Sequence, residues 1–448
     1  MRPRAQLPDL GGPRLDQESS SRYALPLMQR LALALGLCAT ASRAQVSVHY
    51  QGTVATQVHP SFAAAYSGDR SMRPGAESAT SVILDLFLAA HPWPGGEIYL
   101  QPELSGGLGL SQTLGVAAFP SGEVYRVGKA EPTPYVARAF VRQTLGLGGG
   151  RERVGEAPGQ IALERDRNRL TLIAGKLSTP DLFDANPVSS DPHTRFESWG
   201  LWASAAFDYP ADTRGYTWGI AADLALGSWS ARAGMFLEPT EANQIHLEWD
   251  LGRARSLVAE TEWRFGGGAV RVLGFFNTAH MGSYEESLRL GNEPPDVTKT
   301  RADGRTKGGA CASVNLALSD WLAGFARASF NDGANETWAF TEIDRSLALG
   351  MVASGDRWAR PGDEAGAALV ISGLSDPHRR YLRAAGLGFL IGDGALRYGP
   401  EVLGELFYRV ALSREISAIG HYQPIVNPAF NRDRGPIHVF TAALHVAL

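Results

Sequence analysis

Apolar and polar side chains alternate along most of the chain after residue 82, in short runs of about 8–12 residues separated by turn-forming residues. In the run 259–265, Ala, Thr, Trp and Phe alternate with Glu, Glu and Arg, and in 245–251 Ile, Leu, Trp and Leu alternate with His, Glu and Asp. A period of two places successive side chains on opposite faces of a β-strand. The pattern predicts an all-β fold whose strands each carry one apolar and one charged face.

This pattern predicts eighteen candidate strands, and residues 46–50 form a further candidate. The eighteen lie at 82–89, 96–104, 136–147, 169–177, 198–207, 216–226, 229–237, 244–251, 254–265, 269–277, 308–318, 321–331, 338–352, 364–372, 383–391, 400–410, 413–422 and 437–448. A bacterial single-chain barrel has an even number of strands, so we expect about 16 barrel strands (16–18), with the surplus candidates in loops.

Two architectures fit strands with one apolar face. A soluble β-sandwich hides that face in a core, whereas a transmembrane barrel turns it to lipid and fills its lumen with polar groups. Short connections at 226–229 and 410–413 alternate with long polar ones at 105–135 and 278–307. Short periplasmic turns and long extracellular loops are typical of an outer-membrane barrel. We therefore expect a transmembrane antiparallel β-barrel.

Composition agrees with this expectation and excludes other classes. The net charge of −4 gives no electrostatic basis for nucleic-acid binding. No apolar run after residue 45 approaches the roughly 20 residues of a spanning helix. The 51 glycines and 9% aromatic residues suit tight turns and aromatic girdles at the membrane interfaces.

The N-terminal part has a different character. Residues 28–44 combine a basic start, an apolar stretch and small residues before Gln45, which is typical of a secretory signal peptide cleaved after Ala44. Residues 1–27 are interpreted as an over-extended start or a disordered extension, 45–80 as a segment packed at or in the barrel, and 81–448 as the barrel domain. After cleavage only Cys311 remains, so no intramolecular disulfide can form.

The last strand carries a further signal. Phe440, Leu444 and Leu448 share one face with Ala442 and Val446, and the chain stops on this alternating strand. Such an end resembles an outer-membrane assembly signal, so we expect the barrel-assembly machinery to be a partner. The usual final residue of such signals is Phe, whereas this chain ends in Leu.

Motifs for catalysis or cofactor binding are missing from the sequence. It contains no G-x-x-x-x-G-K-[ST], H-E-x-x-H, C-x-x-C or G-x-S-x-G motif, and its ten histidines have no ligand spacing. We therefore expect no enzyme activity, no cofactor and no metal. Two facing carboxylates could still make a glycosidase, so a soluble secreted or periplasmic β-rich glycoside hydrolase or sugar-binding protein stays open as the alternative.

The charged faces supply candidate lumen residues. Arginine beside carboxylate beside an aromatic ring suits a sugar channel, because hydroxyls bond to guanidinium and carboxylate while sugar faces stack on rings. For any one of these residues the competing interpretation is that its charge only solvates a wide lumen. The candidates are Arg138, Arg142, Glu103, Arg232, Glu260, Glu262, Arg264, Arg327 and Glu405.

Several longer stretches resemble one family. Residues 191–202 (DPHTRFESWGLW), 207–219 (FDYPADTRGYTWG) and 427–436 (NPAFNRDRGP) are similar to motifs of the carbohydrate-selective porins, the OprB family. Shorter stretches at 93–104, 115–120, 140–144 and 175–176 are also similar, and the resemblance runs from about residue 50 to the C-terminus. The chain departs from the family in its final Leu448 and in the order His193-Thr194-Arg195.

The resemblance implies an outer-membrane barrel, usually of 16 strands, in a Gram-negative bacterium. It implies facilitated diffusion of small sugars through a lumen narrowed by inward loops and basic residues. Arg138, Arg142 and Lys176 match the family motifs and are the constriction candidates that it implies. The expected partners are small-molecule sugars and outer-membrane lipid, with no nucleic acid, and the barrel would be a monomer or a homotrimer.

Overall fold

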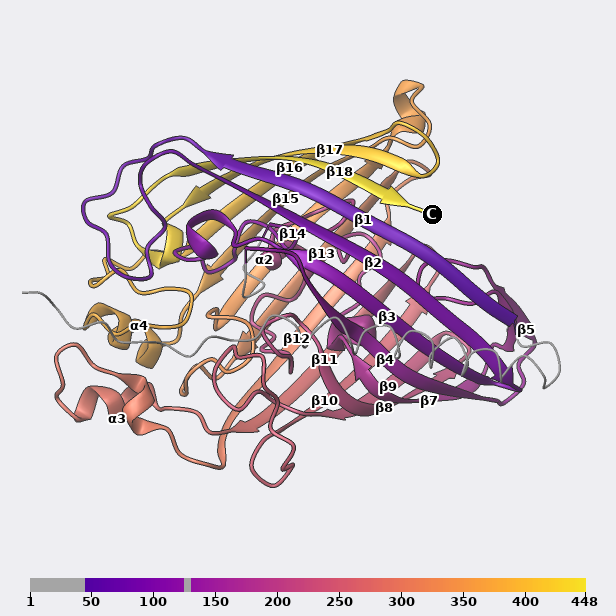
Figure 1. Ribbon diagram of the computed structural model, residues 1–448, viewed down its shortest axis with the longest axis horizontal. Helices are drawn as coiled ribbons and strands as arrows, with labels where there is room; N and C mark the ends of the chain where they lie inside the picture. Colours follow the sequence, from indigo (N-terminus) through magenta and orange to yellow (C-terminus); the bar gives the residue numbers. More distant parts are fainter. Residues whose placement is uncertain (1–44, 125–129) are drawn as a thin grey trace, which may run out of the picture. The chain divides into compact units, whose positions relative to one another are not determined.

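The computed structural model describes residues 45–124 and 130–448, and its compact unit spans Val46–Leu448. The predicted signal peptide 28–44 and residues 1–27 lie outside the described residues. Within the described part, sixteen antiparallel strands form one closed barrel, and two more form a separate hairpin (Figure 1). The predicted barrel of about 16 strands is therefore confirmed.

The barrel strands follow the chain in order around the ring, interrupted only by the hairpin β5–β6 between β4 and β7. Their bounds are β1 Gln45–His59, β2 Glu77–Trp93, β3 Gly96–Gly106, β4 Thr133–Gly146, β7 Arg169–Leu177, β8 Thr217–Leu226, β9 Trp229–Phe236, β10 Arg255–Phe265, β11 Gly268–Ala279, β12 Arg305–Ala317, β13 Leu322–Asn331, β14 Arg345–Ser354, β15 Glu364–Gly373, β16 Glu401–Ala411, β17 Ile416–Val426 and β18 Ile437–Ala447. The hairpin consists of β5 Arg151–Val154 and β6 Leu163–Asp166.

The first and last strands close the ring. β1 pairs with β18 over the register Gln51↔Ala447 to Val58↔Phe440. Closure leaves no unpaired strand edge, which satisfies the backbone hydrogen bonds without water. The closure also places Gln45–His59 in the barrel wall, ahead of the barrel domain predicted for residues 81–448.

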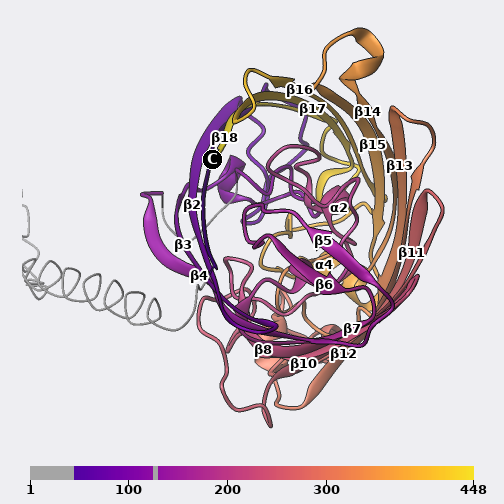
Figure 2. The same ribbon diagram turned by 90° about the vertical axis from the view of Figure 1, so that its right-hand side faces the viewer.

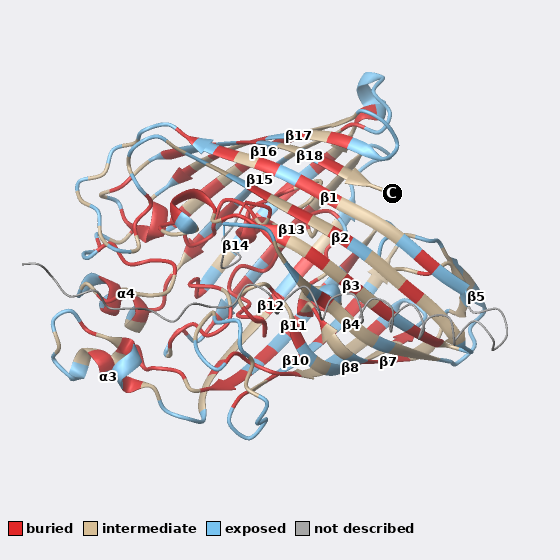
Figure 3. Ribbon diagram, viewed as in Figure 1, coloured by how far each residue is buried: buried red, intermediate tan, exposed pale blue. Residues whose placement is uncertain are grey.

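Side chains alternate between the two faces of the wall. On β14, Leu347, Leu349 and Met351 are exposed, and the intervening Ala348 is buried. Large apolar side chains are exposed in the same way on most other strands. Bands of buried and more exposed residues therefore alternate along the strands (Figure 3). A soluble protein does not expose a continuous apolar belt, so this outer face requires lipid.

Aromatic side chains mark both rims of this belt. Trp263 packs against Phe265 and Trp358 against Tyr408 near the short-turn end, while Trp218 lies beside Trp249 near the loop end. Aromatic girdles of this kind sit at the two membrane–water interfaces.

The two ends of the barrel differ. At one end, turns such as 94–95, 227–228 and 266–267 join neighbouring strands, and the C-terminus lies there. At the other end, long loops carry the helices. These are η1 Leu110–Gln112, η2 Thr179–Asp181, α2 Trp199–Trp202, α3 Tyr284–Arg289, η3 Val297–Thr300, α4 Asp376–Arg383 and η5 Pro428–Phe430, and η4 Gly355–Trp358 lies in a turn of the opposite end. Among the described residues, no helix is long and apolar enough to cross a bilayer.

One long loop fills much of the barrel interior. Residues 178–216, here called the lumen loop, join β7 to β8 and place α2 inside the ring (Figure 2). Phe196, Trp199 and Phe207 of this loop are fully buried against inward side chains of the wall. The Phe196 ring packs edge-on against the Phe407 ring, and the centres of the Phe207 and Phe275 rings lie 5.1 Å apart. Much of the lumen is thus an apolar core and not a water-filled space.

Three predicted strands are wrong. Residues 198–207 form α2 and coil inside the barrel, 244–251 lie in the loop before β10, and 383–391 comprise the last residue of α4 and the loop after it. In each, apolar residues recur along the sequence, but the segment belongs to no strand of the sheet. The run 244–251, for example, has only an isolated bridge, Pro239↔Leu247, and no ladder.

Candidate functional site

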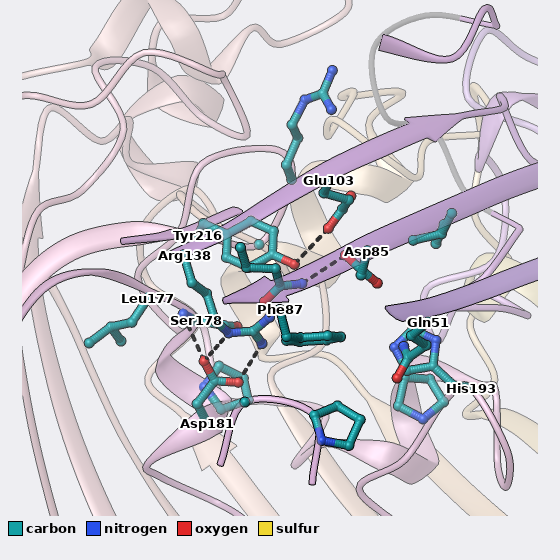
Figure 4. Close-up of a pocket in the computed structure, with 18 of the residues that line it drawn as sticks. Gln51, Asp85, Phe87, Glu103, Arg138, Leu177, Ser178, Asp181, His193 and Tyr216 are labelled. Atoms are coloured by element: carbon teal, nitrogen blue, oxygen red, sulfur yellow. Dashed lines mark hydrogen bonds and ion pairs between the residues drawn. The ribbon is translucent and has the colours of Figure 1, made fainter. Parts of the chain in front are cut away.

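A cavity of about 510 Å³ runs along one wall of the barrel, beside the lumen loop. Its walls come from β1–β4 and β7, and its opposite side comes from the lumen loop and the loop after β3 (Figure 4). Aromatic rings and charged groups alternate around it. The rings include Phe87, Tyr99, Phe140, Phe119 and Tyr216.

Arg138 spans this cavity from β4 to the lumen loop. Its Nε and Nη2 donate to the two carboxylate oxygens of Asp181, each at 2.6 Å. Its Nη1 donates to Gln101 Oε1 at 2.5 Å, and its guanidinium lies 5.2 Å from the centre of the Tyr216 ring. A bidentate pair fixes both the position and the orientation of the guanidinium plane. The Arg138 side chain is therefore held in one position across this part of the cavity.

Arg142 lies four residues further along β4, on the same face. Its Nε and Nη2 donate to the Glu97 carboxylate at 3.0 and 2.5 Å, and Nη2 also donates to the Tyr99 hydroxyl. The guanidinium lies 4.8 Å from the Tyr99 ring centre, and that ring stacks on Phe140 at 4.7 Å. Arg138, Phe140 and Arg142 thus follow one another on the cavity wall as a charged, an aromatic and a charged side chain, as their shared face in the sequence predicts.

Carboxylates and amides from β2 and β3 complete this wall. Glu103 accepts hydrogen bonds from the hydroxyls of Tyr135 and Tyr216, at 2.6 and 3.0 Å. Gln101 donates to Asp85 at 2.7 Å. The row Arg142, Arg138, Gln101, Asp85 and Glu103 thus presents donors and acceptors side by side, as a polyhydroxylated ligand requires.

His193 of the lumen loop faces this row from across the cavity (Figure 4). Its Nδ1 lies 2.6 Å from the buried Glu123 carboxylate, and its ring stacks on His445 at 5.9 Å. Burial lowers the pKa of His193, but the nearby Glu123 carboxylate outweighs burial and raises that pKa to about 10. His193 therefore stays protonated below that pH, and its positive charge is balanced by the Glu123 carboxylate.

Glu123→Gln should make the ion selectivity of the channel depend on pH. Without the carboxylate, the pKa of His193 falls towards its ordinary range, and the imidazole loses its charge as pH rises through neutrality. In wild type this charge is lost only as pH rises through about 10. Reversal potentials measured from about pH 5 to pH 9 should shift further towards cation selectivity in the variant than in wild type. The exposed Glu415→Gln serves as control; an E123Q channel with the pH dependence of wild type would contradict this account of His193.

Lys176 lies close to this wall but does not line the cavity. Its ammonium nitrogen lies 3.9 Å from the Asp212 carboxylate, 5.6 Å from the centre of the Tyr135 ring and 6.0 Å from the centre of the Tyr216 ring. It supports the two tyrosines that hold Glu103.

Four other candidates form one ion-pair network on β9 and β10. Arg232 contacts Glu260 at 2.5 Å and Glu262 at 3.5 Å, and Arg264 contacts Glu262 at 2.6 Å. The predicted parity is correct, because all four lie on the inward face, but they do not line the cavity. Glu260 also accepts a hydrogen bond from the backbone N–H of Asp184 in the lumen loop, at 2.6 Å.

Arg327 and Glu405 hold the lumen loop in place. Arg327 donates to Asp184 at 2.5 Å and to Ser190 at 2.6 Å, and Glu405 accepts from the backbone N–H groups of Glu197 and Ser198 at 2.8 and 3.0 Å. Both wall residues are almost fully buried. Of the ten sequence candidates, the structure therefore places Arg138, Arg142 and Glu103 on the cavity, and the others in supporting positions.

Some cavity residues are not among the sequence candidates. Asp85 is the single charge on the inward face of 82–89, between Ile83 and Phe87, so the period of two could have identified it. Asp181 and His193 belong to the lumen loop, and no local pattern reveals which wall residue a folded-back loop will meet. Within the described residues, no group of three or more His, Cys, Asp or Glu side chains could hold a metal ion.

Comparisons with known proteins agree with this geometry. The family described as "Carbohydrate-selective porin, OprB family" matches residues 69–448. No curated protein sequence matches the chain significantly.

Solved structures of outer-membrane channels share the fold. The high-pH structure of Pseudomonas putida OprB is 15% identical, with a TM-score of 0.67, and the match covers 94% of this chain and 97% of that one. The outer-membrane channel DcaP of Acinetobacter baumannii is 10% identical, with a TM-score of 0.51, covering 90% of this chain and 97% of that one. At such low identity these likenesses establish the barrel fold alone.

Proposed function

Since the chain belongs to the OprB family of carbohydrate-selective porins, we propose that small sugars pass through it along the wall that carries Arg138, Arg142 and Glu103. The protein is an outer-membrane channel of a Gram-negative bacterium, and transport is passive facilitated diffusion. The alternative of a soluble hydrolase or sugar-binding protein is not favoured, because the large apolar side chains of the barrel face outward.

The observation that carries the proposal is the row of fixed donors and acceptors beside aromatic rings on the same wall. Arg138 and Arg142 are held by Asp181 and Glu97 before any ligand arrives. Sugar hydroxyls can replace water on these groups without reorganising them, and the rings of Phe87 and Phe140 offer apolar faces to the sugar. Each contact is weak and repeated along the wall, as rapid exit from a channel requires.

The roles of individual side chains follow from their contacts. The guanidinium groups donate to sugar oxygens, and Glu103 and Asp85 accept from hydroxyls. No step needs a metal, a nucleotide or a covalent intermediate. The supporting network of Arg232, Glu260 and Glu262 acts on the solute only through the position of the lumen loop, since Glu260 bonds to that loop.

Replacing both Arg138 and Arg142 with Ala should weaken sugar-dependent block of the ion current. A hydrogen bond to a charged group contributes about 1.5–3 kcal/mol, so loss of these donors should weaken sugar binding roughly tenfold or more. The measurement is glucose titration of single-channel conductance in a planar bilayer. Arg264→Ala is the matched control, because Arg264 is inward but lies off the cavity. Block equal to wild type in R138A/R142A refutes the assignment of this wall.

A further inference from the structure

The connection between β4 and β7 is longer than the short turns at the same end of the barrel. Neighbouring strands there are joined by turns such as 94–95 and 227–228, whereas residues 147–168 form the β5–β6 hairpin. In the view onto this end, β5 and β6 lie across the barrel opening (Figure 2). The hairpin thus stands where a solute would leave the channel towards the periplasm.

The hairpin is braced as a unit. Gly148, Gly149 and Gly150 all have positive φ, at 83°, 77° and 85°, and let the chain turn away from the wall. Glu152 of β5 pairs with Arg165 of β6 at 2.8 Å and with Arg169 of β7 at 3.0 Å. The base of the hairpin is therefore joined to the wall by charge as well as by the chain.

The tip of the hairpin, residues 155–161, contacts the barrel wall at β1, β2 and β3. Ile161 is fully buried and packs against Ala89 and Tyr99, with Phe140 against the same cluster. Glu156 lies 3.3 Å from His49 of β1. The tip itself is a tight turn, in which Ala157 and Gln160 exchange backbone hydrogen bonds at 3.1 and 2.9 Å.

Two tip residues face the cavity itself. Pro158 and Gly159 line it, together with Arg142 and Phe140 of the wall. The hairpin is thus held at its base by β4 and β7 and at its tip by β1–β3, and between these attachments it borders the path of the solute.

We propose that the β5–β6 hairpin forms a second, fixed restriction at the periplasmic end of the channel, in series with the one that Arg138 and the lumen loop form together, and that it limits the size of the sugars that pass. This inference rests on the proposed function in one respect, the path along the Arg138–Arg142 wall. A solute that spans both restrictions must satisfy both at once, so longer saccharides are excluded more strongly than single sugars.

The first test removes the restriction. Residues 148–167 are replaced by Asn-Gly, because this pair favours the type I′ turn that joins adjacent strands, and Leu147 and Asn168 already face each other through a 2.8 Å backbone bond. Single-channel conductance should rise about twofold or more, and liposome swelling with a size series of saccharides should show faster entry of the longer ones. A folded variant with wild-type conductance and size limit overturns the proposal.

The second test adds bulk while the hairpin keeps its attachments at its base and at Ile161. Pro158→Trp places a large ring into the cavity, and conductance should fall to about half or less. Arg153→Trp places the same ring on the exposed face of the hairpin, where the Arg153 side chain is 88% exposed, and conductance should stay unchanged. Equal conductance of the two variants overturns the proposal. Failure of the sugar assignment would look different, because wild-type current would then be insensitive to glucose whatever the hairpin variants do.

Discussion

Replacing Arg327 with Ala is expected to destabilise the folded barrel by about 3–5 kcal/mol and to raise its ion conductance. The Arg327 side chain is 1% exposed and lies 2.5 Å from the Asp184 carboxylate, which is buried as well. Its loss leaves that carboxylate buried with only the donors of Ser204, its backbone N–H at 2.5 Å and its hydroxyl at 2.8 Å. An uncompensated buried charge is costly, and the lumen loop can relieve it only by leaving the wall.

Unfolding midpoints in urea, measured in lipid vesicles, and single-channel conductance check this expectation. Arg264→Ala is a control of the same chemistry, because its ion pair with Glu262 is 42% exposed on the arginine side and should contribute about 0–1 kcal/mol. Adding Asp184→Asn to Arg327→Ala should recover part of the lost stability, since the buried charge is then gone. Equal midpoints for R327A and R264A would show that the pair does not hold the loop.

The barrel follows from sequence because most of its wall has a period of two, with register shifts at Ala90–Trp93 and Gln101–Pro102. Arg138, Phe140 and Arg142 were placed on the inward face by parity alone, and they line the cavity. The hydrogen-bonded partner on the next strand enforces this parity, since a one-residue shift would put charges into lipid. Local pattern and global structure agree wherever a strand has lipid on one side.

The interior could not be derived in the same way. Residues 198–207 alternate like a strand, yet Trp199 and Leu201 point into a core that other loops complete, and the chain there forms α2. A strand-like sequence pattern alone therefore does not establish a hydrogen-bonded ladder. Residues 244–251 make the same point, because Trp249 lies beside the outward Trp218 at the rim without being part of the sheet.

The roles of the inward charges depend on contacts that are distant in sequence. Glu405 and Arg327 have the parity of lumen residues, but their partners, Glu197, Ser198 and Asp184, come from a loop that the pattern cannot fold. The hairpin 147–168 is a second example, because the contact between Ile161 and the inner wall depends on residues that are distant in sequence.

Leu349→Arg is expected to cost about 2–4 kcal/mol of folding free energy in lipid, because it places a charge near the middle of the membrane-facing surface. Leu349 is 52% exposed at the centre of β14. The matched control is Leu412→Arg, in the turn after β16, where the leucine is 61% exposed. The same substitution near the interface should cost about 0–1 kcal/mol.

The comparison separates burial in lipid from exposure to water, because the two leucines lose similar contacts within the protein. Urea unfolding in vesicles, followed by tryptophan fluorescence, gives the free energies, and heat-modifiable migration on a gel reports the folded fraction. In a soluble protein, an arginine at either exposed position would be nearly neutral. Equal stability of the two variants would therefore mean that the apolar belt around β14 does not face hydrocarbon, whereas a penalty at Leu349 alone locates the membrane core on that strand.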